Sequence, residues 1–147
     1  MSSARSARVA MAGEDAGCER NRTERRGRRV HIVDDDAWVS DSLVALLETY
    51  GFEAIAHASG TALLADPRHR EMGCLIIDQQ MPGMSGLEVL MALQCKAVFV
   101  PAILIGGRLD AVSVERAAKL GVIAVLEKPF TGARLVGLVR AGLERPC

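Results

Sequence analysis

Acidic side chains and one lysine stand where three apolar runs of the sequence end. Asp34, Asp35 and Asp36 follow the first run, Asp78 ends the second, and Lys128 comes shortly after the third. Carboxylates that converge repel one another, so either their pKa values rise or a cation lies between them. Oxygen ligands favour Mg²⁺, which usually takes one or two protein carboxylates and keeps several waters. These residues are therefore a candidate magnesium site, provided that the fold brings them together.

A lysine beside such a site suits attack on phosphorus. An aspartate such as Asp78, held between a divalent cation and the Lys128 ammonium, can attack a phosphoryl group in line while both cations neutralise its equatorial oxygens. Each motif also has a simpler interpretation. The acidic triplet can be a solvated turn that starts a helix, and Asp78 and Lys128 can each belong to an ordinary loop. The chemical interpretation is favoured by their joint occurrence at strand ends.

Short apolar runs and amphipathic stretches alternate along the chain after Arg29. The predicted strands are Val30–Val33, Glu53–His57, Cys74–Asp78, Ala102–Ile105 and Val122–Leu126. The predicted helices cover Val39–Tyr50, Ser59–Ala65, Gly86–Gln94 and Asp110–Leu120, with a last helix that Thr131 caps. Near-continuous apolar strands need two buried faces, which predicts an α/β fold with a doubly wound parallel sheet. Ligands of such sheets bind outside the carboxyl ends of the strands, where the acidic motifs stand.

The helical segments carry apolar residues at a helical spacing, which predicts their buried faces. In the first helix this spacing puts Leu43, Leu47 and Tyr50 on one face. In the third helix it turns Leu90 and Met91 inward. We therefore expect all five side chains to contribute to the core.

Composition places the chain among globular proteins of one domain. It has 147 residues, of which 50% are hydrophobic and 24% charged. Aromatic residues make up only 3%, which argues against base stacking on an aromatic surface. Lys and Arg balance Asp and Glu at 18 each, but residues 1–29 carry a net charge of +4 and the rest −4. The remaining basic residues are scattered, so nucleic acid is an improbable partner for the body.

Residues 1–29 differ from the rest of the chain. They are rich in Ser, Ala, Gly, Arg and Glu and lack a sustained apolar period, which predicts a disordered basic arm. Such an arm either contacts nucleic acid or an acidic partner, or is a solvated leader without a role of its own. The folded domain is predicted to cover residues 30–147.

Cysteine spacing and hydropathy bear on metal binding and on the cellular location of the protein. The four cysteines form no CxxC pair, so neither a zinc site nor a thioredoxin-like motif is predicted. The longest apolar stretch, Ala97–Ile105, is much shorter than a membrane span, and the amino terminus has no apolar core of a signal peptide. We therefore expect a cytoplasmic protein without membrane contact.

Three motifs together resemble the receiver domain of two-component response regulators, in particular its FixJ-type subclass. They are VHIVDDD at Val30–Asp36, DQQMPGMSG at Asp78–Gly86 and EKPF at Glu127–Phe130. The resemblance extends from Val30 to about Glu144, with the motifs in order and at suitable spacing. It implies a flavodoxin-like (βα)5 fold with strand order 2-1-3-4-5.

The resemblance also implies a role for each motif residue. Asp78 would accept a phosphoryl group from a histidine kinase or a small phosphodonor. Asp35 would bind Mg²⁺ directly, Asp34 would bind it through water, and the backbone carbonyl of Gln80 would be a further ligand. Lys128 would hold the phosphoryl oxygens, and its peptide bond to the following proline would be cis, which is uncommon among X–Pro bonds.

Two positions depart from the family pattern. Receivers of this kind normally carry Ser or Thr at the end of strand four and an aromatic residue in strand five, where this chain has Gly106 and Val125. The parts that accept phosphate are thus present, whereas the parts that report it to the surface are altered. Alternatively, a backbone N–H replaces the missing hydroxyl and Val125 only packs.

The expected function is that of a stand-alone receiver in a phosphorelay, with no enzymatic activity beyond Mg²⁺-assisted self-phosphorylation and dephosphorylation. Its partners would be a sensor histidine kinase or a histidine phosphotransfer protein, and a downstream protein of unknown identity. A homodimer through the last helices and strand five is a further arrangement that the resemblance allows. One alternative is a pseudo-receiver that binds proteins irrespective of phosphate. A phosphatase on a related fold is less favoured, because no second acidic motif or lid insertion is visible.

Overall fold

A parallel sheet of five strands forms the centre of the molecule. The computed structural model describes residues 29–144. The predicted arm therefore lies outside the described residues except for Arg29, which begins the first strand. The strands are β1 (Arg29–Val33), β2 (Glu53–His57), β3 (Cys74–Asp78), β4 (Ala102–Gly106) and β5 (Val122–Glu127). Every neighbouring pair is parallel and the order is β2-β1-β3-β4-β5, so the predicted fold class and strand order are confirmed.

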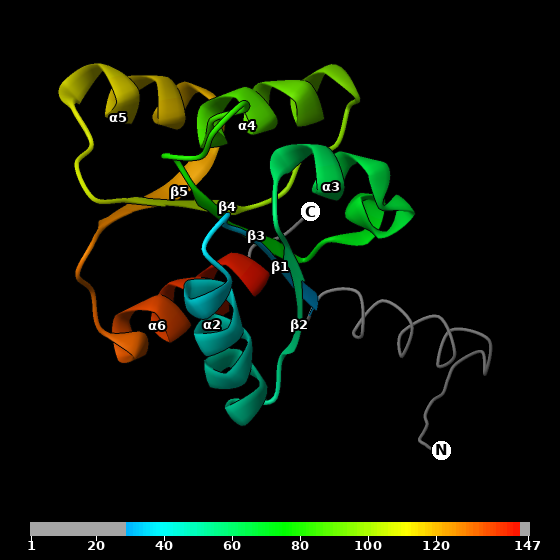
Figure 1. The fold of residues 1–147 in the computed structure, drawn as a ribbon, viewed down its shortest axis with the longest axis vertical. Helices are drawn as coiled ribbons and strands as arrows, with labels where there is room; N and C mark the ends of the chain where they lie inside the picture. The colour runs from blue at the N-terminus through cyan, green and yellow to red at the C-terminus, as the bar shows by residue number, and fades with distance from the viewer. Residues whose placement is uncertain (1–28, 145–147) are drawn as a thin grey trace.

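Helices cover both faces of this sheet. They are α2 (Ala37–Thr49), α3 (Gly60–Ala65), α4 (Gly86–Cys95), α5 (Ala111–Lys119) and α6 (Gly132–Leu143), with a short 3₁₀ helix η1 (Pro67–Glu71) after α3. Figure 1 shows α2 and α6 on one side of the sheet and α3, α4 and α5 on the other. The helices begin at polar caps: Asp110 accepts a hydrogen bond from the Ser113 backbone N–H, and the predicted cap Thr131 accepts one from the Arg134 backbone N–H.

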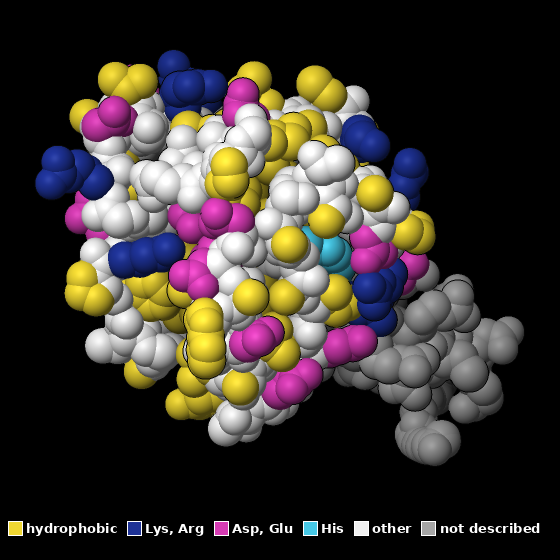
Figure 2. Space-filling view, viewed as in Figure 1, with side chains coloured by type: hydrophobic (Ala, Val, Ile, Leu, Met, Phe, Trp, Pro, Cys, Tyr) yellow, Lys and Arg dark blue, Asp and Glu magenta, His cyan; other side chains and the backbone are white. Residues whose placement is uncertain are grey.

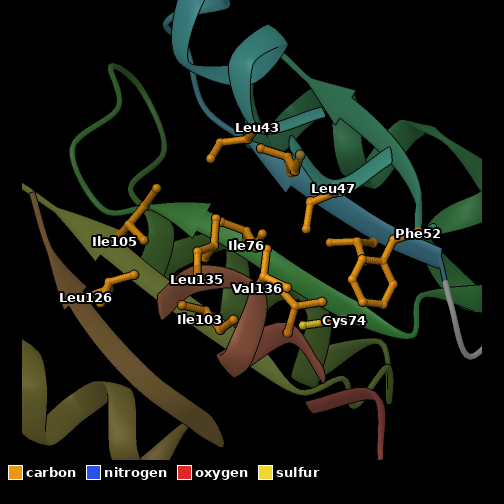
Figure 3. Close-up of a cluster of buried hydrophobic side chains, with 13 residues drawn as sticks. Leu43, Leu47, Phe52, Cys74, Ile76, Ile103, Ile105, Leu126, Leu135 and Val136 are labelled. Carbon is orange, nitrogen blue, oxygen red and sulfur yellow. The ribbon is translucent and has the colours of Figure 1, made fainter. Parts of the chain in front are cut away.

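Each face of the sheet has its own hydrophobic core. Alternate strand residues point to opposite sides, so Ile76 packs toward α2 and α6 while Leu75 and Ile77 pack toward α3, α4 and α5. Figure 3 shows the first of these cores, where Leu47 and Leu135 approach Ile76 from the two helices. All of these side chains are fully buried. The two cores hold the strands, and hence their carboxyl ends, in a fixed register.

Two helical residues predicted to be buried are exposed instead. The Tyr50 side chain is 42% exposed because Tyr50 lies beyond the last turn of α2, where the chain reverses, and the guanidinium of Arg140 lies 5.5 Å from its ring centre. Met91 is 44% exposed on the outer side of α4. The buried side chains of α4 are instead Leu87, Val89, Leu90 and Leu93, and they include Leu90, which the helical spacing predicted. The prediction for Tyr50 and Met91 was therefore wrong.

Two buried histidines stack on each other on the face of the sheet that α3 covers. The rings of His31 in β1 and His57 at the end of β2 are nearly parallel, with centres 5.1 Å apart, and His31 Nδ1 lies 2.8 Å from His57 Nε2. Both side chains are buried, and His31 Nε2 has no hydrogen-bond partner among the described residues. Burial lowers the pKa of His31 to about 4, with a smaller contribution from the neighbouring His57. His31 is therefore neutral in the folded protein near pH 7.

This neutral histidine predicts a loss of stability in mild acid. Its folded pKa lies below that of the unfolded chain, about 6.5, so the unfolded chain binds the proton first. The contribution of His31 is complete above about pH 6.5 and is lost as the pH falls toward about 4, which corresponds to roughly 2 to 3 kcal/mol of unfolding free energy. Urea unfolding at neutral and mildly acidic pH should show this decrease.

A matched variant separates His31 from the carboxylates that also titrate in acid. His31→Phe keeps a planar ring but cannot bind a proton, so its unfolding free energy should fall less steeply over the same pH range, whatever its stability at neutral pH. Equal slopes for the two proteins would show that His31 does not carry the effect.

Candidate functional site

The candidate site lies at the carboxyl end of the sheet, where three of the strands bring the predicted residues together. Asp34 follows β1, Asp78 is the last residue of β3, and Lys128 follows β5. In this strand order β3 lies between β1 and β4, so the central carboxylate is Asp78. Because the strands are parallel, these three residues lie at the same edge of the sheet, as expected from the sequence.

The distances show a compact cluster of three carboxylates and one ammonium. Lys128 Nζ lies 3.4 Å from Asp78 Oδ2 and 3.9 Å from Asp34 Oδ2. Asp34, Asp35 and Asp78 each offer an oxygen, and these oxygens all lie within 4.8 Å of one another. Asp34 and Asp78 are buried, with 1% and 4% of their surface exposed, while Asp35 is exposed. The structure thus brings together four of the five charged side chains that the sequence singled out. Asp36 instead caps α2, where its carboxylate accepts a hydrogen bond from the Trp38 backbone N–H.

The environment of Asp34 is unfavourable for an isolated negative charge. Burial raises the pKa of Asp34, and the nearby Asp78 raises it further, against the lowering effect of the Asp36 backbone N–H, which donates to Asp34 Oδ1 at 2.9 Å. The other oxygen, Oδ2, is buried and accepts no hydrogen bond from any described residue. A buried carboxylate oxygen that accepts no hydrogen bond and whose nearest cation is the Lys128 ammonium, 3.9 Å away, is costly, so the donor set and its charge fit a hard divalent cation such as Mg²⁺.

The neighbours of Asp78 leave one of its oxygens directed toward the lysine. Oδ1 accepts a hydrogen bond from the Gln80 backbone N–H at 3.1 Å, and Oδ2 faces Lys128 Nζ. Gly86, which begins α4, approaches this turn so closely that a Cβ on it would lie 2.8 Å from the Asp78 carbonyl oxygen. Glycine at this position therefore lets α4 start directly against the end of β3, which fixes the orientation of the aspartate.

The loop after β5 places the lysine. The Lys128–Pro129 peptide bond is cis, as the resemblance implied. The Lys128 backbone N–H donates to the Gly106 carbonyl at 2.8 Å, which ties this loop to the end of β4. The ammonium therefore approaches Asp78 from the side of β4 and β5, and Asp34 approaches it from the side of β1.

The two atypical positions lie beside this cluster. Gly106 ends β4, and a Cβ built on it would lie 2.8 Å from Gln80 Oε1 and 3.0 Å from a methyl carbon of Leu109. Val125 in β5 is partly buried and packs against the core under α3, α4 and α5. The space beside Gly106 is thus occupied by the Gln80 side chain, and Val125 has a packing role.

The Gln80 side chain is a part of the site that the sequence did not indicate. Its Oε1 accepts a hydrogen bond from the Gly107 N–H, and its Nε2 donates to the Arg108 carbonyl, both at 3.1 Å. The sequence analysis had assigned only the backbone carbonyl of Gln80 to the site. The only signal available was the absence of a side chain at Gly106, which leaves room for another residue, but sequence spacing does not reveal which one.

The distribution of surface charge fits a small acidic site and not an extended basic surface for nucleic acid. Figure 2 shows acidic side chains gathered near the middle of one face, whereas the Lys and Arg side chains are scattered around it. This face offers no basic stripe of the kind that nucleic-acid-binding domains present. Among the described residues, no helix combines the length and the apolar character that crossing a bilayer requires.

Comparisons with known proteins give a consistent result. Residues 30–140 match the family model described as response regulator receiver domain. The chain is 40% identical over 116 residues to the transcriptional regulatory protein FixJ of Azorhizobium caulinodans, covering 79% of this chain and 55% of that protein. It is 37% identical over 115 residues to the response regulator protein TmoT of Ectopseudomonas mendocina, covering 78% and 52%. The chain therefore spans about half the length of these relatives.

Solved structures share the same arrangement. A crystal structure of FixJ-N superposes with a TM-score of 0.74 at 34% identity, covering 81% of this chain and 95% of that one. The response regulator StyR superposes with the same TM-score at 35% identity, covering 79% of this chain and 59% of that one. The residues that the family model matches, 30–140, include Asp34, Asp78 and Lys128.

Proposed function

Since the chain belongs to the response regulator receiver domain family, of the FixJ type, we propose that it accepts a phosphoryl group on Asp78 in a Mg²⁺-dependent phosphorelay. The observation that carries this proposal is the position of Asp78 Oδ2, 3.4 Å from the Lys128 ammonium and within a cluster of three carboxylates. An aspartate with a cation on one side and a cation-binding carboxylate pair on the other is arranged for attack on phosphorus.

The transfer uses one oxygen of Asp78 as the nucleophile. With a phosphohistidine donor, an O–P bond forms as the N–P bond breaks, and the bonding electron pair returns to the imidazole nitrogen. With acetyl phosphate, the acetyl O–P bond breaks and acetate leaves. Lys128 holds an oxygen of the moving phosphoryl group, while the Gln80 N–H keeps the other oxygen of Asp78 oriented.

The metal would be held by the acidic cluster. Asp35, Asp78 and the Gln80 backbone carbonyl would supply ligands directly, and Asp34 would act through water. Bound Mg²⁺ would supply positive charge that neutralises the phosphoryl oxygens. Two features of Asp34 support this assignment: burial and the nearby Asp78 raise its pKa, and its Oδ2 accepts no hydrogen bond from the described residues. A cation in the cluster would offset both.

The partners follow from the same proposal. The phosphodonor would be a sensor histidine kinase or a histidine phosphotransfer protein in the cytoplasm, and residues 30–147 would accept the phosphoryl group without residues 1–29. Relatives such as FixJ are transcriptional regulators by name, but this chain spans about half of their length. The module acts as a signalling component, with self-phosphorylation and dephosphorylation as its only chemistry.

The test is to incubate the full chain with Mg²⁺ and acetyl phosphate and to measure its intact mass. We expect the mass of one added phosphoryl group, lost on mild alkaline treatment because an acyl phosphate is labile. An unmodified chain, together with binding to a histidine kinase that does not depend on phosphate, would instead favour the phosphate-independent pseudo-receiver.

A further inference from the structure

We propose that the Gln80 carboxamide replaces the missing hydroxyl at Gly106 and acts as a reversible latch between Asp78 and the loop that joins β4 to α5. This inference rests on the proposed function, because the ligand that moves the latch is a phosphoryl group on Asp78. It concerns a different residue from the phosphoacceptor and assigns the side chain of Gln80 a positioning role.

The latch is visible as two hydrogen bonds from one side chain. Oε1 of Gln80 accepts from the Gly107 N–H and Nε2 donates to the Arg108 carbonyl, so the carboxamide holds two consecutive residues of the β4–α5 loop. The backbone N–H of the same residue donates to Asp78 Oδ1. Gln80 therefore touches the phosphoacceptor with its backbone and the neighbouring loop with its side chain.

The Gln80 carboxamide lies close to the position that a Cβ on residue 106 would take. A Cβ at Gly106 would lie 2.8 Å from Gln80 Oε1, closer than real Cβ contacts allow. Gln80 in this position and a Ser or Thr at position 106 are thus mutually exclusive unless one of them moves. The absence of a side chain at Gly106 therefore leaves the room that the Gln80 carboxamide occupies.

A phosphoryl group would compete for the donor of the latch. Charge-assisted hydrogen bonds to anionic oxygens are stronger than those to a neutral carbonyl. Nε2 of Gln80 would therefore exchange the Arg108 carbonyl for a phosphoryl oxygen. Because the carboxamide rotates as one planar group, Oε1 would leave the Gly107 N–H at the same time. Both Gln80 contacts are released in one step, which loosens Gly107 and Arg108 in the loop before α5.

The experiment compares the full-length wild type with Gln80→Met, with and without Mg²⁺ and beryllofluoride, by amide hydrogen exchange and amide NMR shifts at Gly107–Leu109. In the wild type, beryllofluoride should speed exchange of the Gly107 amide by about twofold to tenfold, which is the loss of one ordinary hydrogen bond. In Gln80→Met this exchange should already be fast without beryllofluoride and should change little on its addition.

A matched control tests whether any glutamine would give this result. Gln94 in α4 also donates its Nε2 to a loop carbonyl, that of Leu120, at 3.3 Å. Gln94→Met should respond to beryllofluoride as the wild type does. A second variant, Gln80→Glu, can still accept from Gly107 but cannot donate, so Gly107 should stay protected with and without beryllofluoride.

The outcomes separate this inference from the proposed function. If beryllofluoride shifts no amide near Asp78 in any of the proteins, the phosphoacceptor assignment itself fails. If it shifts those amides but the response at Gly107–Leu109 is as large in Gln80→Met as in the wild type, the site is correct and the latch is refuted. The same holds if Gly107 exchange without beryllofluoride is equal in these two proteins.

Discussion

Asp78→Asn should reduce covalent phosphorylation by acetyl phosphate to an undetectable level while leaving the fold intact. The asparagine amide is a poor nucleophile, so the reacting oxygen is lost. Its volume is nearly unchanged, and its carbonyl oxygen can still accept from the Gln80 N–H, as Asp78 Oδ1 does. Lys128 keeps Asp34 as a partner, since Nζ already lies 3.9 Å from Asp34 Oδ2.

Intact mass after treatment with acetyl phosphate and Mg²⁺ measures the loss, and urea unfolding measures the fold. We expect the unfolding free energy to stay within about 1 kcal/mol of the wild type, because the variant also removes one member of a repelling group of carboxylates. The exposed Asp41 on α2 supplies a control, since Asp41→Asn should be phosphorylated normally. A phosphoryl group mapped to another residue of the wild type would overturn the assignment.

Asp35→Asn should weaken Mg²⁺ binding by at least about tenfold and should slow phosphorylation to a similar degree. Asp35 is exposed, so the substitution should cost little stability and any effect belongs to the metal. In the wild type, millimolar Mg²⁺ should raise the thermal unfolding temperature, because the ion binds only the native cluster. Removal of the metal with a chelator should abolish phosphorylation.

The measurement is a titration of the unfolding temperature with Mg²⁺ for the wild type, Asp35→Asn and Asp41→Asn. The last of these should follow the wild type, since it removes an equal charge from a residue that is not a member of the cluster. A wild-type unfolding temperature that does not respond to Mg²⁺ would show that the three carboxylates are not a metal site.

The strands and their order were accessible from the sequence because each depends on a local pattern with a strong physical cause. Runs such as Cys74–Ile77 are short, apolar at consecutive positions and rich in isoleucine, which favours a strand covered on both faces over a helix. The helical faces were less certain. Tyr50 fits the helical period, yet it lies after the last turn of α2, and the position at which a helix ends is set by only a few residues.

The charged part of the site could be predicted because its residues end strands. Parallel strands present their carboxyl ends at one edge, so Asp34, Asp78 and Lys128 had to converge once the strand order was known. The Gln80 latch could not be predicted in this way. Gln80 contacts Gly107 and Arg108, which lie 27 and 28 residues further along the sequence. The side-chain conformation of an exposed glutamine leaves no periodic pattern in the sequence from which these contacts could be predicted.

The parallel strands also determine where the two ends of the described chain leave the molecule. Because each helix returns the chain to the starting edge of the sheet, the end of α6 comes back to that edge: a Cβ on Gly142 would contact Cys74, Pro101 and Ile123, at the beginnings of β3, β4 and β5. Arg29 starts β1 at the same edge. A surface tether, a fluorophore or a fused reporter attached beside Arg29 or Glu144 therefore lies a full strand length from Asp78. Attachment beside either of these two residues therefore leaves the acidic cluster at the opposite edge of the sheet, away from the attachment point.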